Sequence, residues 1–261
     1  MVLTKIKPDI KAVIIDMDGV LWKADQAICN LPDLFDNFST HNIKVLLATN
    51  NAMSTVQQYV QKLAIFGASL EPWQILTSGM AVAHLMQQRF PAGGPVYIVG
   101  EQAMIDTLKE YGFYHNSKES IAVVGAADRT FNYEKLKDAA LLLRKGLPFF
   151  YTNADPTYPT PEGLAPGAGS ILAAIKAATD VQPIVAGKPE PYLFQFAMER
   201  LNTIPENTLV IGDRLETDIL GGHRAGCKTA LVLSGVATQE DAQNYSPKPD
   251  IIIDDITFLF P

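Results

Sequence analysis

Short apolar runs alternate along the chain with stretches of helical spacing. The first run, Ala12–Ile15, is too short for a helix and suits a strand that is buried on both faces of a parallel sheet. After a polar loop over Trp22–Asn30, the apolar residues Leu31, Leu34, Phe35 and Phe38 recur at the spacing of a helix. Repeated strand–helix units of this kind predict an α/β fold with a parallel sheet.

The remaining predicted elements follow the same two patterns. Further strands are predicted at Ile43–Ala48, Trp73–Leu76, Val96–Val99, Ile121–Val124, Pro148–Tyr151, Pro183–Ala186, Thr208–Ile211, Thr229–Leu233 and Asp250–Ile253. Further helices are predicted around Val56–Leu63 and over 78–90, Ala103–Tyr111, Tyr133–Lys145, Ser170–Ala178, Tyr192–Leu201 and Glu216–Ala225.

The pattern changes register at Thr77, where a helix follows the third strand directly. The block from there to Tyr151 alternates strand and helix on its own, so it can fold as a compact domain inserted into the first one. The predicted division is a first part over 1–78, an inserted domain over 79–184 and a second part of the first domain over 185–261.

The stretch after Tyr151, TNADPTYPTPEGLAPGAGS, is rich in Pro, Gly, Asn and Asp and is predicted to be an ordered loop. It is longer than a connection needs, and long ordered loops are often lids or binding loops. Asn153, Asp155 and Tyr158 are therefore candidates for contacting a substrate. A turn-rich domain edge is the alternative.

Composition narrows the class of partner. The chain has 261 residues, 48% of them hydrophobic, a formal net charge of −7 and no run rich in Lys or Arg, so neither nucleic acid nor an anionic membrane is expected as a partner. The N-terminal stretch lacks the apolar centre of a signal peptide, and no apolar stretch approaches the ~18 residues of a membrane span. A cytoplasmic protein with a small-molecule partner is expected.

The only cysteines, Cys29 and Cys227, form no CxxC pair, which argues against disulfides and zinc.

Carboxylates follow two of the predicted strands. Asp16 and Asp18 lie on a tight turn at the carboxyl end of the first strand, where open α/β sheets bind ligands. Two like charges this close repel unless a cation shares the site, and Mg²⁺ is the default hard cation for oxygen ligands. An Asx-turn that only closes the strand is the alternative. Asp213 and Asp218 mark a second acidic strand end, which favours the metal site.

Two other stretches carry groups that suit an anion. Thr49, Asn50 and Asn51 follow the second strand, and their hydroxyl and amides can hydrogen-bond an anion, although the same residues also form ordinary turns and caps. Lys188 stands in a Gly-Lys-Pro tripeptide, where its ammonium is poorly placed for a solvated surface and suits phosphate. Such tripeptides are common by chance, so the Gly-Lys-Pro pattern alone does not establish that Lys188 binds phosphate.

Four stretches, taken in order, resemble the four motifs of the haloacid dehalogenase superfamily. They are DMDGV at 16–20, Thr49-Asn50, Lys188 and GDRLETD at 212–218. The insertion between the second and third motifs resembles the C2-type cap of its subfamily IIA, the NagD-like and 4-nitrophenylphosphatase-like enzymes, including the stretches GAADRTFNYEKL and TNADPTYPT…PGAGS. The resemblance covers essentially the whole chain and departs at no catalytic position. It implies a Rossmann-like parallel-sheet core with an inserted α/β cap, and phosphatase activity.

The resemblance also implies a role for each acidic residue. Asp16 would be the nucleophile that attacks phosphorus and forms an aspartyl-phosphate. Asp18 would protonate the leaving oxygen and then activate water, while its backbone carbonyl binds Mg²⁺. The carboxylates of Asp16 and Asp213 would complete the protein ligands of the metal. Asp218 would orient Lys188 or a metal-bound water.

The remaining candidate residues are implied to bind substrate. Thr49 would hold the phosphoryl group together with the amides beside it, Asn50 and Asn51, and Lys188 would offset charge on both nucleophile and phosphate. In the cap, Asp155 and Tyr158 would close over the leaving group, exclude water and set specificity.

Competing function classes fit less well. Dehalogenases of the superfamily lack the second acid, Asp18, and its P-type pumps place Thr there and need membrane helices. A non-catalytic phosphate-binding or regulatory protein of this fold remains an alternative, and it would be expected to have lost one of Asp16, Asp18, Lys188 or Asp213. A nucleotide-binding Rossmann domain would have a glycine-rich turn after its first strand, which this chain lacks.

The sequence therefore predicts a Mg²⁺-dependent phosphatase for small phosphate monoesters: a sugar phosphate, a nucleoside monophosphate or an aryl phosphate. Fold analogy does not separate these substrates. A large cap often leaves an apolar edge that supports a dimer, so a homodimer formed through the cap is a further expectation.

Overall fold

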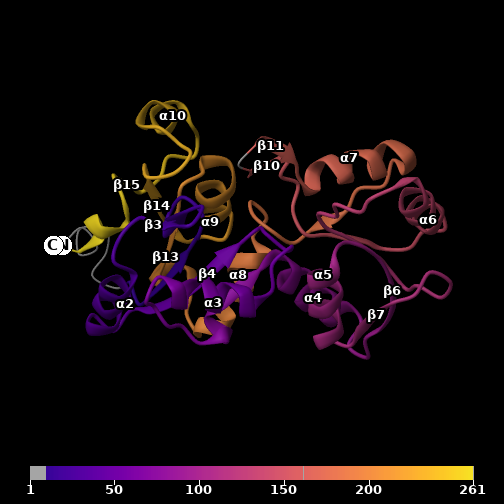
Figure 1. The fold of residues 1–261 in the computed structure, drawn as a ribbon, viewed down its shortest axis with the longest axis horizontal. Coiled ribbons are helices and arrows are strands. Elements are labelled where there is room, and N and C mark those ends of the chain that lie inside the picture. The colour runs from indigo at the N-terminus through magenta and orange to yellow at the C-terminus, as the bar shows by residue number, and fades with distance from the viewer. Residues whose placement is uncertain (1–9, 161, 261) are drawn as a thin grey trace. The chain divides into compact units, whose positions relative to one another are not determined.

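The computed structural model describes residues 10–160 and 162–260, which form two compact units. Unit 1 takes the described residues up to Thr49, together with Val56–Leu76 and those from Lys188 onward. Unit 2 takes Asn50–Thr55 and Thr77–Gly187. Figure 1 shows their helices and strands and labels those for which there is room.

Unit 1 is built on a six-stranded sheet with the order β15-β14-β13-β1-β4-β5. The strands are β1 (Ala12–Ile15), β4 (Lys44–Thr49), β5 (Ile75–Thr77), β13 (Thr208–Gly212), β14 (Lys228–Val232) and β15 (Ile251–Ile253). The central strand β1 runs parallel to both β4 and β13, and all four of its residues are buried. This is the placement that an uninterrupted apolar run predicts.

Helices and short turns complete unit 1. They are α2 (Leu31–Thr40), α3 (Val56–Ile65), α8 (Tyr192–Leu201), α9 (Leu220–Arg224), α10 (Gln239–Asn244), the 3₁₀ turns η1 (Pro72–Gln74), η2 (Pro205–Asn207) and η4 (Ile256–Leu259), and a π-type turn, η3 (Leu215–Ile219). Of the four residues whose spacing predicted helix α2, Leu31, Leu34 and Phe38 are buried, and Phe35 is only partly buried. Its N-cap, Asn30, accepts a hydrogen bond from the backbone of Asp33.

Unit 2 has its own five-stranded sheet, with the order β12-β9-β8-β6-β7 and parallel pairing throughout. Its strands are β6 (Gly94–Val99), β7 (Phe113–His115), β8 (Val123–Gly125), β9 (Phe149–Tyr151) and β12 (Ile184–Val185). Its helices are α4 (Ser78–Arg89), α5 (Gln102–Glu110), α6 (Tyr133–Arg144) and α7 (Ala168–Thr179). The predicted α/β class is therefore confirmed, with one parallel sheet in each unit.

Several predicted loops contain strands. The stretch Trp22–Asn30 holds a small antiparallel hairpin of β2 (Trp22–Lys23) and β3 (Gln26–Ala27), and Trp22 is fully buried instead of lying in a polar loop. The loop expected after Tyr151 contains a second antiparallel hairpin, β10 (Thr157–Thr160) and β11 (Gly163–Pro166), so Tyr158 lies on a strand.

Other elements differ in extent or were not predicted. Strand β7 and helix α10 lie outside every predicted element. Where a helix was predicted at Glu216–Ala225, the structure has the π-type turn η3 followed by the short helix α9, and the backbone N–H of Ile219 donates to the carbonyl of Arg214 five residues earlier. In the part of the chain that the structure describes, no helix combines the length and apolarity that crossing a membrane requires.

Candidate active site

The carboxyl ends of β1, β4 and β13 meet at one edge of the unit 1 sheet. Ile15 pairs in parallel register with Leu47 of β4 and with Ile211 of β13, so the residues after these strands are neighbours. The backbone N–H of Asp16 continues the ladder by donating to the carbonyl of Ile211 at 2.8 Å. The sheet thus brings Asp16, Thr49 and Asp213 to the same edge, where open α/β sheets bind ligands.

Lys188 joins two of the acidic residues. Its Nζ donates to Oδ1 of Asp16 at 2.6 Å and to Oδ1 of Asp218 at 2.7 Å. The lysine side chain is only 3% exposed, and that of Asp218 only 2%. A buried ammonium is stable only with such partners, so the lysine and the carboxylates hold each other in place.

The cluster carries more negative than positive charge. Carboxylate oxygens of Asp16, Asp213 and Asp218 lie within 4.8 Å of one another, and Lys188 supplies a single positive charge among them. Burial raises the pKa of Asp16 well above its usual value, Lys188 opposes this shift, and Asp218 and Asp213 add to it. Burial and then Asp218 raise the pKa of Asp213 to about 6. A further cation would relieve this repulsion.

Asp213 has one oxygen engaged and one without a partner. Its Oδ2 accepts a hydrogen bond from the backbone N–H of Val236 at 2.9 Å. Its Oδ1 is buried and accepts no hydrogen bond from the described residues. The backbone of Gly19 and that of Gly235 pass close to Oδ2 of Asp213, so a Cβ at either position would collide with this carboxylate. A buried carboxylate oxygen without a donor is what a metal ligand looks like before the ion binds.

Asp18 is held by a residue that the sequence did not single out. The indole N–H of Trp22 donates to Oδ1 of Asp18 at 2.8 Å, and the Trp22 ring lies 5.8 Å from that of Phe66. Between them, Gly19 adopts a left-handed φ of 84° and donates its N–H to the carbonyl of Trp22. The turn therefore fixes an exposed carboxylate through a buried indole.

Asp218 is fixed from two sides. Besides Lys188 at Oδ1, its Oδ2 accepts hydrogen bonds from the backbone N–H of Arg214 at 3.2 Å and from the hydroxyl of Thr217 at 3.4 Å. The carboxylate thereby anchors the ammonium of Lys188, which in turn contacts Asp16.

The anion-binding candidates divide between the units. Thr49 ends β4 in unit 1 and is buried, whereas Asn50 and Asn51 belong to unit 2. There the amide of Asn50 donates to Oδ2 of Asp155 at 3.0 Å, and the amide of Asn153 donates to the carbonyl of Asn50 at 2.8 Å. The structure thus brings Asn50, Asn153 and Asp155 together.

The structure also places the other residues predicted from the sequence. Lys188 and the carboxylates of Asp16, Asp213 and Asp218 form what we call the lysine–carboxylate cluster. Asp16, Lys188 and Asp213 lie in unit 1 with Asp218, while Tyr158 lies on β10 of unit 2, opposite Ala165 of β11.

The sequence offered little signal for the residues that support the acids. Trp22 follows Asp18 by four positions, and Val236 and Ser234 lie in a glycine-containing loop far along the chain. Val236 acts through its backbone N–H, and the Ser234 hydroxyl donates to the carbonyl of Gly19 at 2.7 Å. Backbone donors have no residue signature, so only the fold could reveal them.

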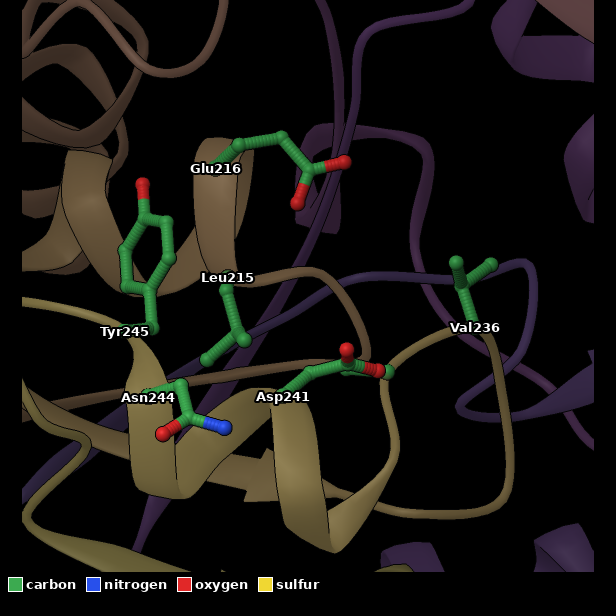
Figure 2. Close-up of a pocket in the computed structure, with 7 residues that line it drawn as sticks. Leu215, Glu216, Val236, Asp241, Asn244 and Tyr245 are labelled. Carbon is green, nitrogen blue, oxygen red and sulfur yellow. The ribbon is translucent and has the colours of Figure 1, made fainter.

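The loop that supports Asp213 also borders a cavity in unit 1. Figure 2 shows this cavity of about 350 Å³ beside helix α10. It is lined by Leu215, Glu216, Val236, Ala237, Asp241, Asn244 and Tyr245. The lining contains none of the residues of the lysine–carboxylate cluster, so the cavity is a neighbour of that cluster and not part of it.

Family and sequence comparisons agree with this geometry. A profile of haloacid dehalogenase-like hydrolases matches residues 13–114, and a profile of HAD-hydrolase-like proteins matches residues 185–259. The chain is 34% identical over 252 residues to the 5'-nucleotidase YutF of Bacillus subtilis, covering 96% of this chain and 98% of that protein. It is 33% identical over 247 residues to the acid sugar phosphatase of Staphylococcus aureus, covering 94% and 95%.

Solved structures give the same result. The 4-nitrophenylphosphatase of Thermotoga maritima is 33% identical with a TM-score of 0.90, covering 95% of each chain, and NagD of E. coli is 30% identical with a TM-score of 0.88, covering 94% and 96%. The glycerol phosphate phosphatase of Mycobacterium tuberculosis in complex with magnesium is 33% identical with a TM-score of 0.87, covering 94% of this chain and 75% of that one. The chain belongs to the haloacid dehalogenase-like hydrolases, as a phosphatase of their NagD-like and 4-nitrophenylphosphatase-like subfamily.

Proposed function

We propose that this protein is a Mg²⁺-dependent phosphatase that hydrolyses small-molecule phosphate monoesters through an aspartyl-phosphate on Asp16. The observation that carries the proposal is the buried ammonium of Lys188 between Asp16 and Asp218, beside a carboxylate of Asp213 with one unpartnered oxygen. A charged lysine at the nucleophile and an open acidic position next to it suit phosphoryl transfer, where charge must be neutralised on several oxygens.

The donor set fits Mg²⁺. Carboxylate oxygens are the ligands that this hard ion prefers, and the orphaned Oδ1 of Asp213 supplies one of them. We infer that Asp16 and Asp213 bind the ion through their carboxylates and Asp18 through its backbone carbonyl. When bound, the ion orients and neutralises phosphoryl oxygens. The related glycerol phosphate phosphatase crystallised with magnesium supports this choice of metal.

The protein's own groups account for the two chemical steps. In the first, an oxygen of Asp16 forms a bond to phosphorus while the bond from phosphorus to the leaving oxygen breaks, and Asp18 gives that oxygen its proton. In the second, Asp18 takes a proton from water, whose oxygen displaces Asp16 from phosphorus. Since the Trp22 indole N–H donates to Oδ1 of Asp18, we infer that Oδ2 is the oxygen that exchanges the proton. Lys188 stays protonated beside Asp16 and offsets charge on the phosphate.

Substrate recognition is proposed for both units. Thr49, Asn50 and Asn51 bind the phosphoryl group, and Asp155 and Tyr158 contact the leaving group. Relatives named as 5'-nucleotidase, acid sugar phosphatase and 4-nitrophenylphosphatase support nucleoside monophosphates, sugar phosphates and aryl phosphates as candidate substrates.

A panel of these esters tests the proposal by phosphate release. We expect turnover with Mg²⁺, none after EDTA treatment and inhibition by the larger Ca²⁺ ion. Asp16→Asn keeps the shape of the side chain but removes its nucleophilicity, so activity should fall by at least about a thousandfold in a folded protein. The matched control is Asp36→Asn, an exposed position on α2, which should leave activity unchanged. Substantial Mg²⁺-dependent turnover in folded Asp16→Asn protein would rule out the covalent mechanism.

A further inference from the structure

The loop after β14 reaches the turn after β1, although the two strands are not neighbours. In the unit 1 sheet, β13 lies between β14 and β1. The hydroxyl of Ser234, two residues after β14, nevertheless donates to the carbonyl of Gly19 at 2.7 Å. The loop therefore crosses the carboxyl end of β13, the strand that Asp213 follows directly.

The crossing encloses the carboxylate of Asp213. The backbone N–H of Val236 donates to Oδ2 of Asp213 at 2.9 Å, and that of Ala237 donates to its backbone carbonyl at 3.0 Å. Gly19 and Gly235 approach the same carboxylate so closely that a Cβ on either would collide with it. The loop and the turn after β1 thus close together on Asp213, while its Oδ1 has no hydrogen-bond partner among the described residues.

The hydrogen bond of Ser234 also fixes the turn that carries Asp18. A trans peptide group is planar, so the carbonyl of Asp18 points opposite to the N–H of Gly19. That N–H donates to the carbonyl of Trp22 at 2.7 Å, and the next carbonyl along the chain, that of Gly19, accepts from Ser234. Two consecutive peptide groups are therefore held, and the orientation of the Asp18 carbonyl is held with them.

The Asp18 carbonyl and the Asp213 carboxylate are two of the three proposed ligands of Mg²⁺. The loop after β14 is hydrogen-bonded both to Asp213 and, through Ser234, to the turn of Asp18, so it sets the spacing of these two ligands. Mg²⁺ demands near-ideal octahedral geometry, whereas the larger Ca²⁺ accepts flexible geometry and a variable number of ligands. A spacing that is fixed before the ion binds therefore matters more for Mg²⁺ than for Ca²⁺.

We propose that Ser234 is a positioning residue of the metal site. Its hydroxyl holds the turn after β1 against the loop that supports Asp213, and this contact sets the spacing of the ligands for Mg²⁺ in preference to Ca²⁺. The role is exerted through the carbonyl of Gly19. The inference rests on the proposed function for the identity of the metal ligands and adds to it the residue that fixes their spacing.

The test measures metal binding in the absence of substrate. Ser234→Ala removes the hydroxyl, so the Kd for Mg²⁺ in isothermal titration calorimetry should rise by about five- to tenfold. The Kd for Ca²⁺ should rise by no more than about twofold, so the preference for Mg²⁺ narrows. Ser234→Thr keeps a hydroxyl at this position and should restore the Kd for Mg²⁺ to within about twofold of the wild-type value.

The matched control is Thr238→Ala, which removes a hydroxyl four positions further along. Thr238 caps helix α10 by exchanging hydrogen bonds with the backbone and side chain of Asp241. Its loss destabilises the helix next to the loop, but the hydrogen bonds that it removes involve neither Gly19 nor Asp213. Both Kd values should therefore stay within about twofold of those of the wild-type protein, even where the Tm falls.

Phosphate release by the wild-type protein, measured alongside, separates this inference from the proposed function. If no phosphate is released but the Kd values change as expected, the proposed function fails and the role of Ser234 stands. An unchanged Kd for Mg²⁺ in folded Ser234→Ala protein, an equal loss for Mg²⁺ and Ca²⁺, or the same loss in Thr238→Ala would overturn that role. So would the absence of Mg²⁺ binding by the wild-type protein.

Discussion

At the residue scale, the single positive charge of Lys188 cannot balance the three carboxylates that lie together in the unit 1 site. Lys188 pairs with Asp16 and Asp218, which leaves the carboxylate of Asp213 without a cation of its own. Breaking such a buried pair is costly because the remaining charge is left without compensation. A divalent ion beside Asp213 would reduce the repulsion among the carboxylates. The position where the charges call for a cation is therefore the proposed metal site.

Trp22 offers a test of how Asp18 is positioned. Trp22→Phe keeps an aromatic ring in the buried site but removes the N–H that donates to Asp18. We expect kcat to fall by about tenfold, with KM within about twofold, because the role proposed for Asp18 lies in the chemical steps and not in ground-state binding. Steady-state kinetics on two substrates would measure this.

The control for that experiment is Trp73→Phe, a half-exposed tryptophan of the same unit, which should leave kcat unchanged. If a folded Trp22→Phe protein keeps the wild-type kcat, the indole does not position the general acid.

At the element scale, the sequence predicted the strands that their own apolar residues identify as buried. Strand β1 is an uninterrupted apolar run, β13 contains the apolar run Leu209–Ile211, and all residues of both strands are buried. The acidic and polar residues that end these strands could be placed at one edge because parallel strands share the direction of their carboxyl ends. This placed Asp16 and Asp213 in the candidate site without knowledge of the fold.

Elements that depend on distant partners could not be predicted in this way. Strand β7 has three residues, of which only Phe113 is buried, and it forms because β6 offers an edge for pairing. The hairpin β10–β11 contains Pro and Gly, which are typical of loops, and its strands exist only through pairing with each other. Helix α10 buries a single side chain, Ala242, so it lacks an apolar stripe. The support of Asp213 by Val236 is likewise a contact between distant segments.

The loop between β8 and α6 provides a prediction about pH. Burial acts to raise the pKa of Asp128, but hydrogen bonds from Lys135 and Thr130 outweigh it and hold the pKa below its ordinary value. A depressed pKa in the folded state stabilises the protein above the unfolded value of about 3.9, and this stabilisation is lost as the pH falls through the lower folded value. Asp128→Asn should therefore destabilise unit 2 by about 1–3 kcal/mol at pH 7, with a smaller difference below about pH 3.9.

Native-state hydrogen exchange of amides in β8 and α6 would measure this difference at both pH values. Asp106→Asn, on the exposed face of α5, serves as the control and should change stability by less than about 0.5 kcal/mol. A destabilisation by Asp128→Asn that is equally large at low pH would show that the ionised carboxylate is not what holds the loop.

At the scale of the whole molecule, the two parallel sheets of the chain carry different charged groups beyond the carboxyl ends of their strands. In unit 1, the carboxyl ends of β1 and β13 carry Asp16 and Asp213, whose charge suits a metal and a phosphoryl group. In unit 2, the ends of β6 and β8 carry Glu101 and Arg129, whose charges cancel.

The division into units predicts where metal binding stabilises the protein. The proposed ligands of Mg²⁺, Asp16, Asp18 and Asp213, all belong to unit 1. A ligand that binds only the folded form stabilises it by about 2.7 kcal/mol at a concentration one hundred times its Kd. Saturating Mg²⁺ should therefore raise the hydrogen-exchange protection of amides in β1 and β13, while amides in β8 of unit 2 change little.

Asp213→Asn should abolish this stabilisation, because it removes the charge of a proposed ligand whose Oδ1 has no hydrogen-bond partner among the described residues. Asp36→Asn, which lies on the exposed face of α2, should retain it. A uniform increase of protection in both units, or an undiminished effect in Asp213→Asn protein, would place the ion elsewhere than at the ends of β1 and β13. Since the measurement needs no substrate and no turnover, it tests the metal site independently of the proposed phosphatase reaction.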